Sequence, residues 1–324
     1  MSGASLLLFS RLIGAELAGA VGKDLLSKCG LSYVVACRYP NDKPKEFLAR
    51  LKKENRRRKK AGGSPMATPA QCCRPRLEAD LRDHRYVITL GSEATKAVLP
   101  GNPNLQRVRG GPTKTSAGKV LPTLNPRNVL RDPQWRTTFH QDVQKAFRFF
   151  QDRLRWEDPQ VNYHPTPEDL EEFFGEVGRL SKDKRILTYD VETDSLEPLT
   201  AGLRCIGIGT ASQVMIVPLL SISGEAEFYS PEDKERVLTV LREMFTDQNI
   251  LKVGHNAGYY DRIVIEQHLG VTPTPLLDTI LLHKLARSEF PHGLGYIGSV
   301  ETDVPSWKAD HTATTAQDDR ELQA

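Results

Sequence analysis

Residues 186–196 read ILTYDVETDSL, and this stretch decides the fold of the second half of the chain. Side chains two positions apart share one face of a β-strand, so we expect Asp190 and Glu192 to project together, with Val191 in the core on the opposite face. Two adjacent carboxylates repel and raise each other's pKa unless a cation lies between them. Hard divalent ions such as Mg²⁺ or Mn²⁺ suit all-oxygen sites of this kind. The plainer interpretation is an exposed strand with ordinary surface acids.

The segments around this strand have the pattern of a sheet domain. Apolar runs with short turns predict two more strands, after which helical spacing alternates with a further strand. The predicted strands are Ile186–Val191, Cys205–Thr210, Val214–Leu219 and Ile250–Gly254, and the predicted helices are Pro231–Phe245, Tyr260–Leu269 and Asp278–Ala286. Three strands followed by alternating helices and strands predict an α/β or α+β domain.

A second acidic position follows the strand Ile250–Gly254. There the sequence GHNAGYYD, residues 254–261, leads into a predicted helix. Asp261 falls in the first turn of that helix, where the helix dipole favours a carboxylate, and this is its plain structural interpretation. Beside Asp190 and Glu192, it is also a candidate third metal-binding carboxylate.

Composition limits the classes of protein to which the chain can belong. The chain has 324 residues, with 44 Lys and Arg against 41 Asp and Glu, and 39% of its residues are hydrophobic. That length has room for about two domains, and the apolar fraction excludes a wholly disordered chain. No apolar run approaches the roughly 20 residues that span a bilayer, so we expect no membrane association. Five cysteines without a repeated spacing argue against a secreted disulfide scaffold, and the N-terminus lacks the basic region of a signal peptide; we therefore expect a cytoplasmic protein.

The first half alternates helical and extended segments. The predicted helices are Leu17–Leu31, Thr68–His84, Ser92–Leu99 and Gln134–Leu154, and the predicted strands are Tyr33–Ala36, Tyr86–Leu90 and Lys119–Leu124. Phe139, Phe147 and Phe150 fit one helix face, which indicates packing rather than base stacking. Asp158–Pro167 is rich in Pro and polar residues and is predicted to be a linker. We therefore predict one domain at residues 1–155, a linker and helix at 156–183, and a second domain at 184–324.

A basic run interrupts the first half. Eight of the eleven residues from Arg50 to Lys60 are Lys or Arg, although the net charge of the whole chain is only +3. One interpretation is an exposed helix end that runs into the loop AGGSP at residues 61–65. The other is a contact to nucleic-acid phosphates with strongly salt-dependent binding, for which the candidates are Arg56, Arg57, Arg58, Lys59 and Lys60.

Four pieces of the second half, taken together and in this order, resemble the DEDD-type 3′–5′ exonucleases, specifically the proofreading domain of phage-type family A DNA polymerases. They are Tyr189–Leu196, His255–Asp261, Leu277–Thr279, and Pro291–Ser299 together with Asp303–Lys308. The resemblance covers about residues 184–320 and implies a ribonuclease H-like fold with two divalent metals, Mg²⁺ or Mn²⁺. Asp190, Glu192 and Asp261 match metal-ligand positions, and Thr193, Leu196 and Asn256 match contacts to the terminal nucleotides. The resemblance further implies a partner, single-stranded DNA or a DNA 3′ end, and release of nucleoside 5′-monophosphates.

The second half also departs from the family pattern. Four residues separate Asn256 from Asp261, where the family usually has three. One extra residue would rotate a helix by about 100°, so we expect it in the loop before the helix. The family's fourth carboxylate, preceded four residues earlier by Tyr or His, has no match before Ala324. We therefore expect a chain truncated before the fourth motif, with a polymerase domain encoded downstream and an active site that is incomplete as written.

The first half resembles the uracil-DNA glycosylase superfamily in a degenerate form, closest to its iron–sulfur type, over about residues 14–150. The matching segments are Val34–Pro40, Thr68–Glu78, Val87–Gly91 and Leu121–Pro126. This resemblance implies a three-layer domain in which a parallel sheet between helices binds DNA.

The residues for glycosylase chemistry are incomplete. The family's Gly-Glu-x-Pro-Gly loop is absent, and Asn125 stands where a His normally precedes Pro. A protonated His can hold charge beside a developing uracil anion, whereas an amide donates only a neutral hydrogen bond. Cys37 and Cys73 match two of the four cysteines that an iron–sulfur cluster needs, so no cluster is expected.

Three functions remain open at this point. The first is a metal-dependent 3′–5′ exonuclease acting on DNA 3′ ends, from the front of a DNA polymerase I-like protein of replication or repair. The second is a non-catalytic DNA-binding fragment, for which the absent fourth carboxylate speaks. The third, an active uracil-DNA glycosylase, has the least support in the residues.

Overall fold

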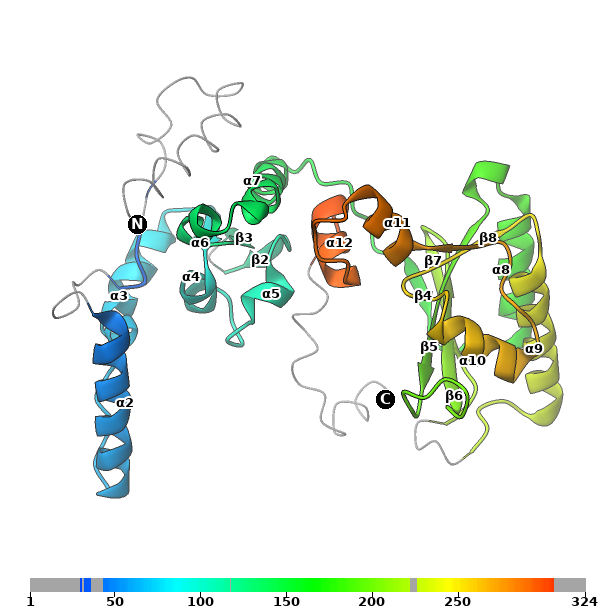
Figure 1. The fold of residues 1–324 in the computed structure, drawn as a ribbon, viewed down its shortest axis with the longest axis horizontal. Helices are drawn as coiled ribbons and strands as arrows, with labels where there is room; N and C mark the ends of the chain where they lie inside the picture. The colour runs from blue at the N-terminus through cyan, green and yellow to red at the C-terminus, as the bar shows by residue number, and fades with distance from the viewer. Residues whose placement is uncertain (1–29, 31, 36–42, 117, 222–225, 306–324) are drawn as a thin grey trace. The chain divides into compact units, whose positions relative to one another are not determined.

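The computed structural model describes residues 30, 32–35, 43–116, 118–221 and 226–305 (Figure 1). These residues form two compact units, which are taken separately below. The first unit runs to Arg155 and also includes the described residues from Gly298 onward. The second unit comprises the described residues between Trp156 and Ile297.

The first unit contains a small sheet with helices. Its helices are α2 (Pro44–Lys60), α3 (Pro69–Arg82), α4 (Ser92–Val98), α5 (Leu105–Val108), α6 (Pro126–Arg131) and α7 (Arg136–Phe150), with a 3₁₀ turn at Pro133–Trp135. Its strands are β1 (Tyr86–Leu90), β2 (Thr113–Thr115) and β3 (Gly118–Thr123), in the order β1-β3-β2. β1 and β3 are parallel and β2 is antiparallel to β3.

Local sequence explains where several of these elements begin. Thr68 caps α3 through a capping box with Gln71, and Pro69 supplies the fixed φ that suits the first helical turn. The helix α7 packs on β3 with Phe139, Val143 and Ala146 fully buried. The ring of Phe150 stacks on Tyr86 at 5.0 Å. The aromatic residues of this helix therefore pack, as the sequence predicts.

A buried charged cluster holds the first unit together. Arg109 donates to Asp142 at 2.5 Å, and the Thr123 hydroxyl donates to the other oxygen of that carboxylate at 2.6 Å. Ser299, from the end of helix α12 (Leu294–Glu301), accepts from Arg109 at 2.5 Å through its hydroxyl and from Lys145 at 2.6 Å through its carbonyl. Residues from the far end of the chain thus complete the core of the first unit.

The second unit is built on a six-stranded mixed sheet in the order β4-β7-β6-β5-β8-β9. The strands are β4 (Gln160–Asn162), β5 (Ile186–Thr193), β6 (Leu203–Gly209), β7 (Gln213–Pro218), β8 (Leu251–Gly254) and β9 (Leu276–Asp278). β5 is central; it is antiparallel to β6 and parallel to β8. The helices are α8 (Pro167–Arg179), α9 (Pro231–Thr246), α10 (Tyr260–Leu269), α11 (Thr279–Ala286) and the first residues of α12, with a 3₁₀ turn at Lys182–Lys184.

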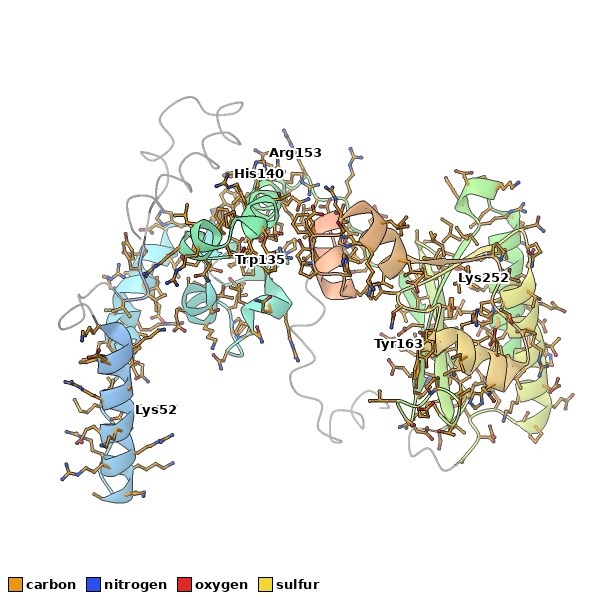
Figure 2. All side chains as sticks on the ribbon, in the orientation of Figure 1. Lys52, Trp135, His140, Arg153, Tyr163 and Lys252 are labelled. Atoms are coloured by element: carbon orange, nitrogen blue, oxygen red, sulfur yellow. The ribbon has the colours of Figure 1, made fainter. Side chains whose placement is uncertain are left out.

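One face of this sheet is covered by helices. Leu187, Tyr189 and Val191 of β5 belong to a single apolar cluster with buried residues of α8, α9 and α10, and Figure 1 shows α8 and α9 side by side along the sheet. Lys252 on β8, labelled in Figure 2, is also fully buried and donates to the Asp247 carbonyl at 2.6 Å. The strict alternation of burial along β5 leaves every second residue on the other, more open face.

Two segments differ from the sequence-based expectation. Part of the predicted linker Asp158–Pro167 forms β4, which pairs in parallel with β7, because its Gln-Val-Asn tripeptide can extend beside an open strand edge. Tyr33, Val34 and Val35 form no strand, and the remaining residue of that predicted strand, Ala36, lies outside the described residues. The predicted helix Leu17–Leu31 also falls almost wholly outside them.

Within the described part of the chain, no helix has the length and apolar character needed to cross a bilayer.

Candidate active site

Asp190 and Glu192 lie on the open face of β5, near its carboxyl end. Tyr189, which precedes Asp190, and Val191, which lies between the two carboxylates, are buried on the helix-covered face. The alternation follows from the pleat of the strand, which turns successive side chains to opposite sides. The two carboxylates therefore lie next to each other on one side of the sheet.

Asp261 reaches the same part of β5 from α10. β8 pairs with β5 only as far as Thr188, so the backbone of β5 beyond that point has no strand partner on this side. The Asp261 carboxylate takes this place and accepts a hydrogen bond from the Val191 amide at 3.1 Å. Asp261 is 7% exposed. The first turn of α10 is thereby fixed against the end of the central strand.

The extra residue between Asn256 and Asp261 is taken up before α10. Asn256 has a left-handed φ of 62°, and the Arg262 amide donates to the Ala257 carbonyl, five residues earlier, at 3.1 Å. That spacing is one residue wider than the ordinary helical hydrogen bond and accommodates one additional residue. Asp261 therefore keeps its contact with β5, as expected for a residue added in the loop.

Asp278 is a residue of the site to which sequence reasoning gave no role. Its carboxylate accepts hydrogen bonds from the amides of Asn256 at 2.9 Å, Gly258 at 3.0 Å and Ile280 at 2.9 Å. It therefore caps α11 and fixes the loop that carries Asn256. Its position as the first residue of a predicted helix is the sequence signal that could have revealed the cap.

The surroundings disfavour charge on all three candidate carboxylates. Burial raises the pKa of Asp190, and burial followed by the nearby charge of Asp190 raises the pKa of Glu192. Burial, with Asp190 as the next cause, raises the pKa of Asp261 to about 6. The charge of His255 lowers the pKa of Asp190, but this effect is smaller than that of burial. A divalent cation would supply the missing positive charge.

The donor set suits a hard cation, although the side chains do not form a closed metal cage. The three candidates offer only carboxylate oxygens, which Mg²⁺ and Mn²⁺ prefer. Among the described residues, no group of three or more His, Cys, Asp or Glu side chains has metal-binding geometry. The phenol of Tyr189 is buried nearby without a hydrogen-bond partner among the described residues.

Two further candidates lie just past Glu192. The Thr193 hydroxyl contacts the Tyr260 hydroxyl at 2.6 Å and donates to the Ser195 carbonyl at 2.8 Å. Leu196 is 94% exposed in the following turn. An apolar side chain this exposed has no packing role in the second unit and is free to contact a ligand.

Family comparisons match each half of the chain to a different domain. The sequence profile described as 3′–5′ exonuclease matches residues 163–312, and that of the uracil DNA glycosylase superfamily matches residues 3–151. This chain carries a uracil-DNA glycosylase superfamily domain followed by a 3′–5′ exonuclease domain. No curated protein sequence matches the chain significantly.

The exonuclease domain has distant likenesses among solved structures. Brucella melitensis NrnC is 21% identical, with a TM-score of 0.34, over 49% of this chain and 71% of that one. Escherichia coli RNase D is 16% identical, with a TM-score of 0.34, over 50% of this chain and 40% of that one. The catalytic core of RRP6 from Trypanosoma brucei is 22% identical, with a TM-score of 0.35, over 50% of this chain and 42% of that one.

In the glycosylase-like domain, Asn125 has a structural task. Its side-chain oxygen accepts from the Arg127 amide at 2.9 Å and so caps α6. Gly91 lies against it, because a Cβ on Gly91 would come within 3.0 Å of the Asn125 Cβ. Of the two cysteines that match cluster positions, Cys73 is buried in α3, and Cys37 lies outside the described residues.

The basic run forms the C-terminal half of α2, and the candidates Arg56, Arg57, Arg58, Lys59 and Lys60 are all exposed. One of them, Arg58, pairs with Glu54 at 3.3 Å. The sequence left open whether this run is a helix end or a binding element. The structure shows that the run is the last part of a regular helix of 17 residues.

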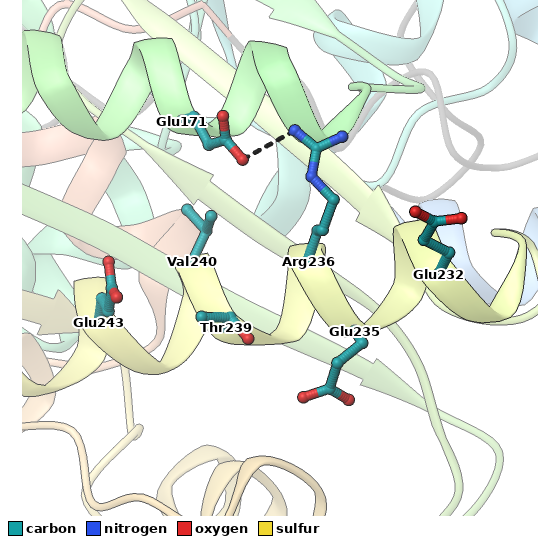
Figure 3. A pocket seen from close by; sticks show the side chains of 7 residues that line it. All are labelled: Glu171, Glu232, Glu235, Arg236, Thr239, Val240 and Glu243. Carbon is teal, nitrogen blue, oxygen red and sulfur yellow. Dashed lines mark hydrogen bonds and ion pairs between the residues drawn. The ribbon is translucent and has the colours of Figure 1, made fainter.

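A shallow groove between α8 and α9 lies outside the carboxylate site. Figure 3 shows its lining, in which Arg236 pairs with Glu171 at 2.9 Å. Glu232, Glu235 and Glu243 lie along the same stretch of α9. None of the candidate site residues lines this groove.

Proposed function

We propose that the exonuclease domain removes nucleotides from DNA 3′ ends with two divalent cations held by Asp190, Glu192 and Asp261. The observation that carries this proposal is that Asp190 and Glu192 share the open face of the central strand, while Asp261, 7% exposed, bonds the Val191 amide between them. The pKa of each of the three carboxyl groups is raised, which disfavours the charged form, and a bound cation would favour it.

The cations would supply the chemistry of phosphodiester cleavage. Asp190, Glu192 and Asp261 would hold the cations, which would supply an activated water and stabilise negative charge on the leaving oxygen. The chain's own residues would hold the substrate: exposed Leu196 would pack against the terminal base, and Asn256 and Thr193 would contact the last nucleotides. The product would be a nucleoside 5′-monophosphate.

The decisive experiment separates metal binding from nucleotide release. Calorimetric titration of the chain with Mn²⁺ is expected to show divalent-ion uptake that Asp190→Ala abolishes. Asp183→Ala, which removes an exposed acid just before β5, serves as the matched control and should bind Mn²⁺ like the parent. Release of 5′-mononucleotides from single-stranded DNA is then measured in Mg²⁺ and Mn²⁺, and equal activity of Asp190→Ala and parent would refute the assignment.

The second candidate is a non-catalytic DNA-binding module. It is favoured by the absence of a closed three-residue metal group among the described residues and of a sequence match to the fourth carboxylate motif. It predicts salt-sensitive DNA binding without divalent-ion uptake or nucleotide release. Mn²⁺ uptake that depends on Asp190 would exclude it.

The wider context follows from the order of the two domains. We propose that this chain corresponds to the front of a DNA polymerase I-like protein that acts in replication or repair, with the glycosylase-like domain holding DNA. Uracil excision is the weakest of the candidate activities, because Asn125 is engaged as a helix cap. A uracil-containing duplex incubated with the chain is expected to stay free of abasic sites.

A further inference from the structure

Helix α2 carries a basic surface that extends well beyond Arg56–Lys60, with one acid, Glu46, in its first turn. At about 100° per residue, its cations fall within roughly half of the helix circumference along about 24 Å of axis. These basic-face residues are Lys45, Arg50, Lys52, Lys53, Arg56, Arg57, Lys59 and Lys60, and all of them are exposed. Figure 2 shows Lys52 projecting from the side of α2.

The opposite side of α2 contacts the segment that follows the helix. Leu51 is 8% exposed there, and Asn55 exchanges two hydrogen bonds with the backbone of Met66, at 2.9 Å and 2.7 Å. Both ion pairs that the structure shows for α2 and its cap, Lys43 with Glu46 and Arg58 with Glu54, involve none of the basic-face residues. The basic face therefore lies opposite these contacts and is exposed.

Like charges gathered on one surface repel each other, and an anionic partner relieves this repulsion. We propose that the basic face of α2 binds the phosphates of duplex DNA without reading its sequence. This deepens the nucleic-acid binding proposed for residues 56–60 but does not depend on the carboxylate site.

The side-chain chemistry of the face distinguishes the duplex from other polyanions. Sites for single strands combine cations with aromatic stacking platforms, and the basic face of α2 carries no aromatic residue. A helix fits the major groove of B-form DNA, whereas the deep, narrow major groove of A-form RNA does not admit it. Membrane-surface helices need an apolar face to insert, and on α2 that side is held by Leu51 and Asn55.

The test compares two triple variants of the full chain. Lys45→Ala/Lys52→Ala/Lys59→Ala removes three lysines seven residues apart, which lie within about 40° of each other on the helix. The control, Lys43→Ala/Lys182→Ala/Lys234→Ala, removes the same charge from positions outside the basic face. Alanine favours helix, so α2 should remain folded, which circular dichroism and thermal unfolding verify.

Binding of a labelled 20-base-pair duplex is measured by fluorescence anisotropy in EDTA over a range of salt concentrations. We expect the basic-face variant to lose about tenfold or more in affinity near 0.1 M salt, and its slope of log K against log[salt] to fall by about 3, because each lost phosphate contact accounts for about 0.9. The control should match the parent. Because binding is measured in EDTA, without divalent ions, a failed exonuclease assignment would leave this inference standing.

Three outcomes would overturn the inference. One is an unchanged duplex affinity and salt slope in a folded basic-face variant. Another is tighter binding of the parent to single-stranded DNA or to an RNA duplex of the same length. The third is loss of binding to phosphatidylserine vesicles, rather than to duplex DNA, in the basic-face variant.

Discussion

Asp278 accepts hydrogen bonds from three amides, and two of these belong to the loop that carries Asn256. Its removal would leave partly buried N–H groups without an acceptor, at a free-energy cost of about 1–3 kcal/mol. We expect Asp278→Ala to lower the unfolding temperature of the exonuclease domain and to speed hydrogen exchange at the Asn256 and Gly258 amides. Asp278→Asn, which keeps one acceptor oxygen, should have a smaller effect. Unchanged exchange in the alanine variant would contradict the assigned role.

Lys252 illustrates a buried charge whose effect on stability depends on pH. Burial lowers its pKa from 10.5 to about 8 in the folded protein. Between these values the unfolded chain binds more protons than the folded one, so stability rises as the pH increases from about 8 to 10.5. Below pH 8 Lys252 is protonated in the folded and the unfolded state, so the full cost of burying its charge lowers the stability of the folded protein.

Replacing Lys252 with Met should remove this dependence. We expect the free energy of unfolding of Lys252→Met at pH 7 to be about 1–3 kcal/mol higher than that of the parent. The variant should also lack the rise in stability between pH 8 and 10.5. Urea unfolding of both proteins at pH 7, 9 and 10.5 measures both effects on the free energy of unfolding. A variant less stable than the parent at pH 7 would show that the bond to the Asp247 carbonyl outweighs desolvation.

At the scale of elements, the end of β8 must lie close to the following loop. A Cβ on Gly254 would come within 2.3 Å of the Ala257 Cβ. We therefore expect Gly254→Ala to displace the loop and to lower both stability and any metal uptake that depends on Asp261. The matched control is Gly178→Ala in α8, where nothing lies within 4 Å and alanine should stabilise by about 0.5–1 kcal/mol. Thermal unfolding and Mn²⁺ titration of both variants provide the measurement, and a fully stable Gly254→Ala would show that the loop can move at no cost.

At the scale of the whole molecule, residues after α12 belong to the core of the first unit. Asp303 pairs with Arg148 at 2.9 Å and accepts from the Arg155 amide at 3.0 Å, with its side chain 10% exposed. We expect Asp303→Ala to destabilise this unit by about 1–3 kcal/mol and to speed hydrogen exchange in α7 while leaving α9 unchanged. Asp152→Ala, which breaks an ion pair whose carboxylate side chain is 79% exposed, should have little effect. Equal exchange in the two variants would argue against a structural role for the segment.

The sequence by itself determined the central strand, the side of it on which Asp190 and Glu192 lie, and the helices α3, α4, α7, α9, α10 and α11. These features follow from local periodicity, caps and turns, which a short window of residues specifies. Tertiary structure decided which distant groups meet: Asp261 on the Val191 amide, Asp278 on the loop of Asn256, Ser299 beside Arg109, and β4 on β7. No local pattern encodes such contacts, because they depend on where β8 ends, which strand edge is open, and which buried groups still need a hydrogen-bond partner.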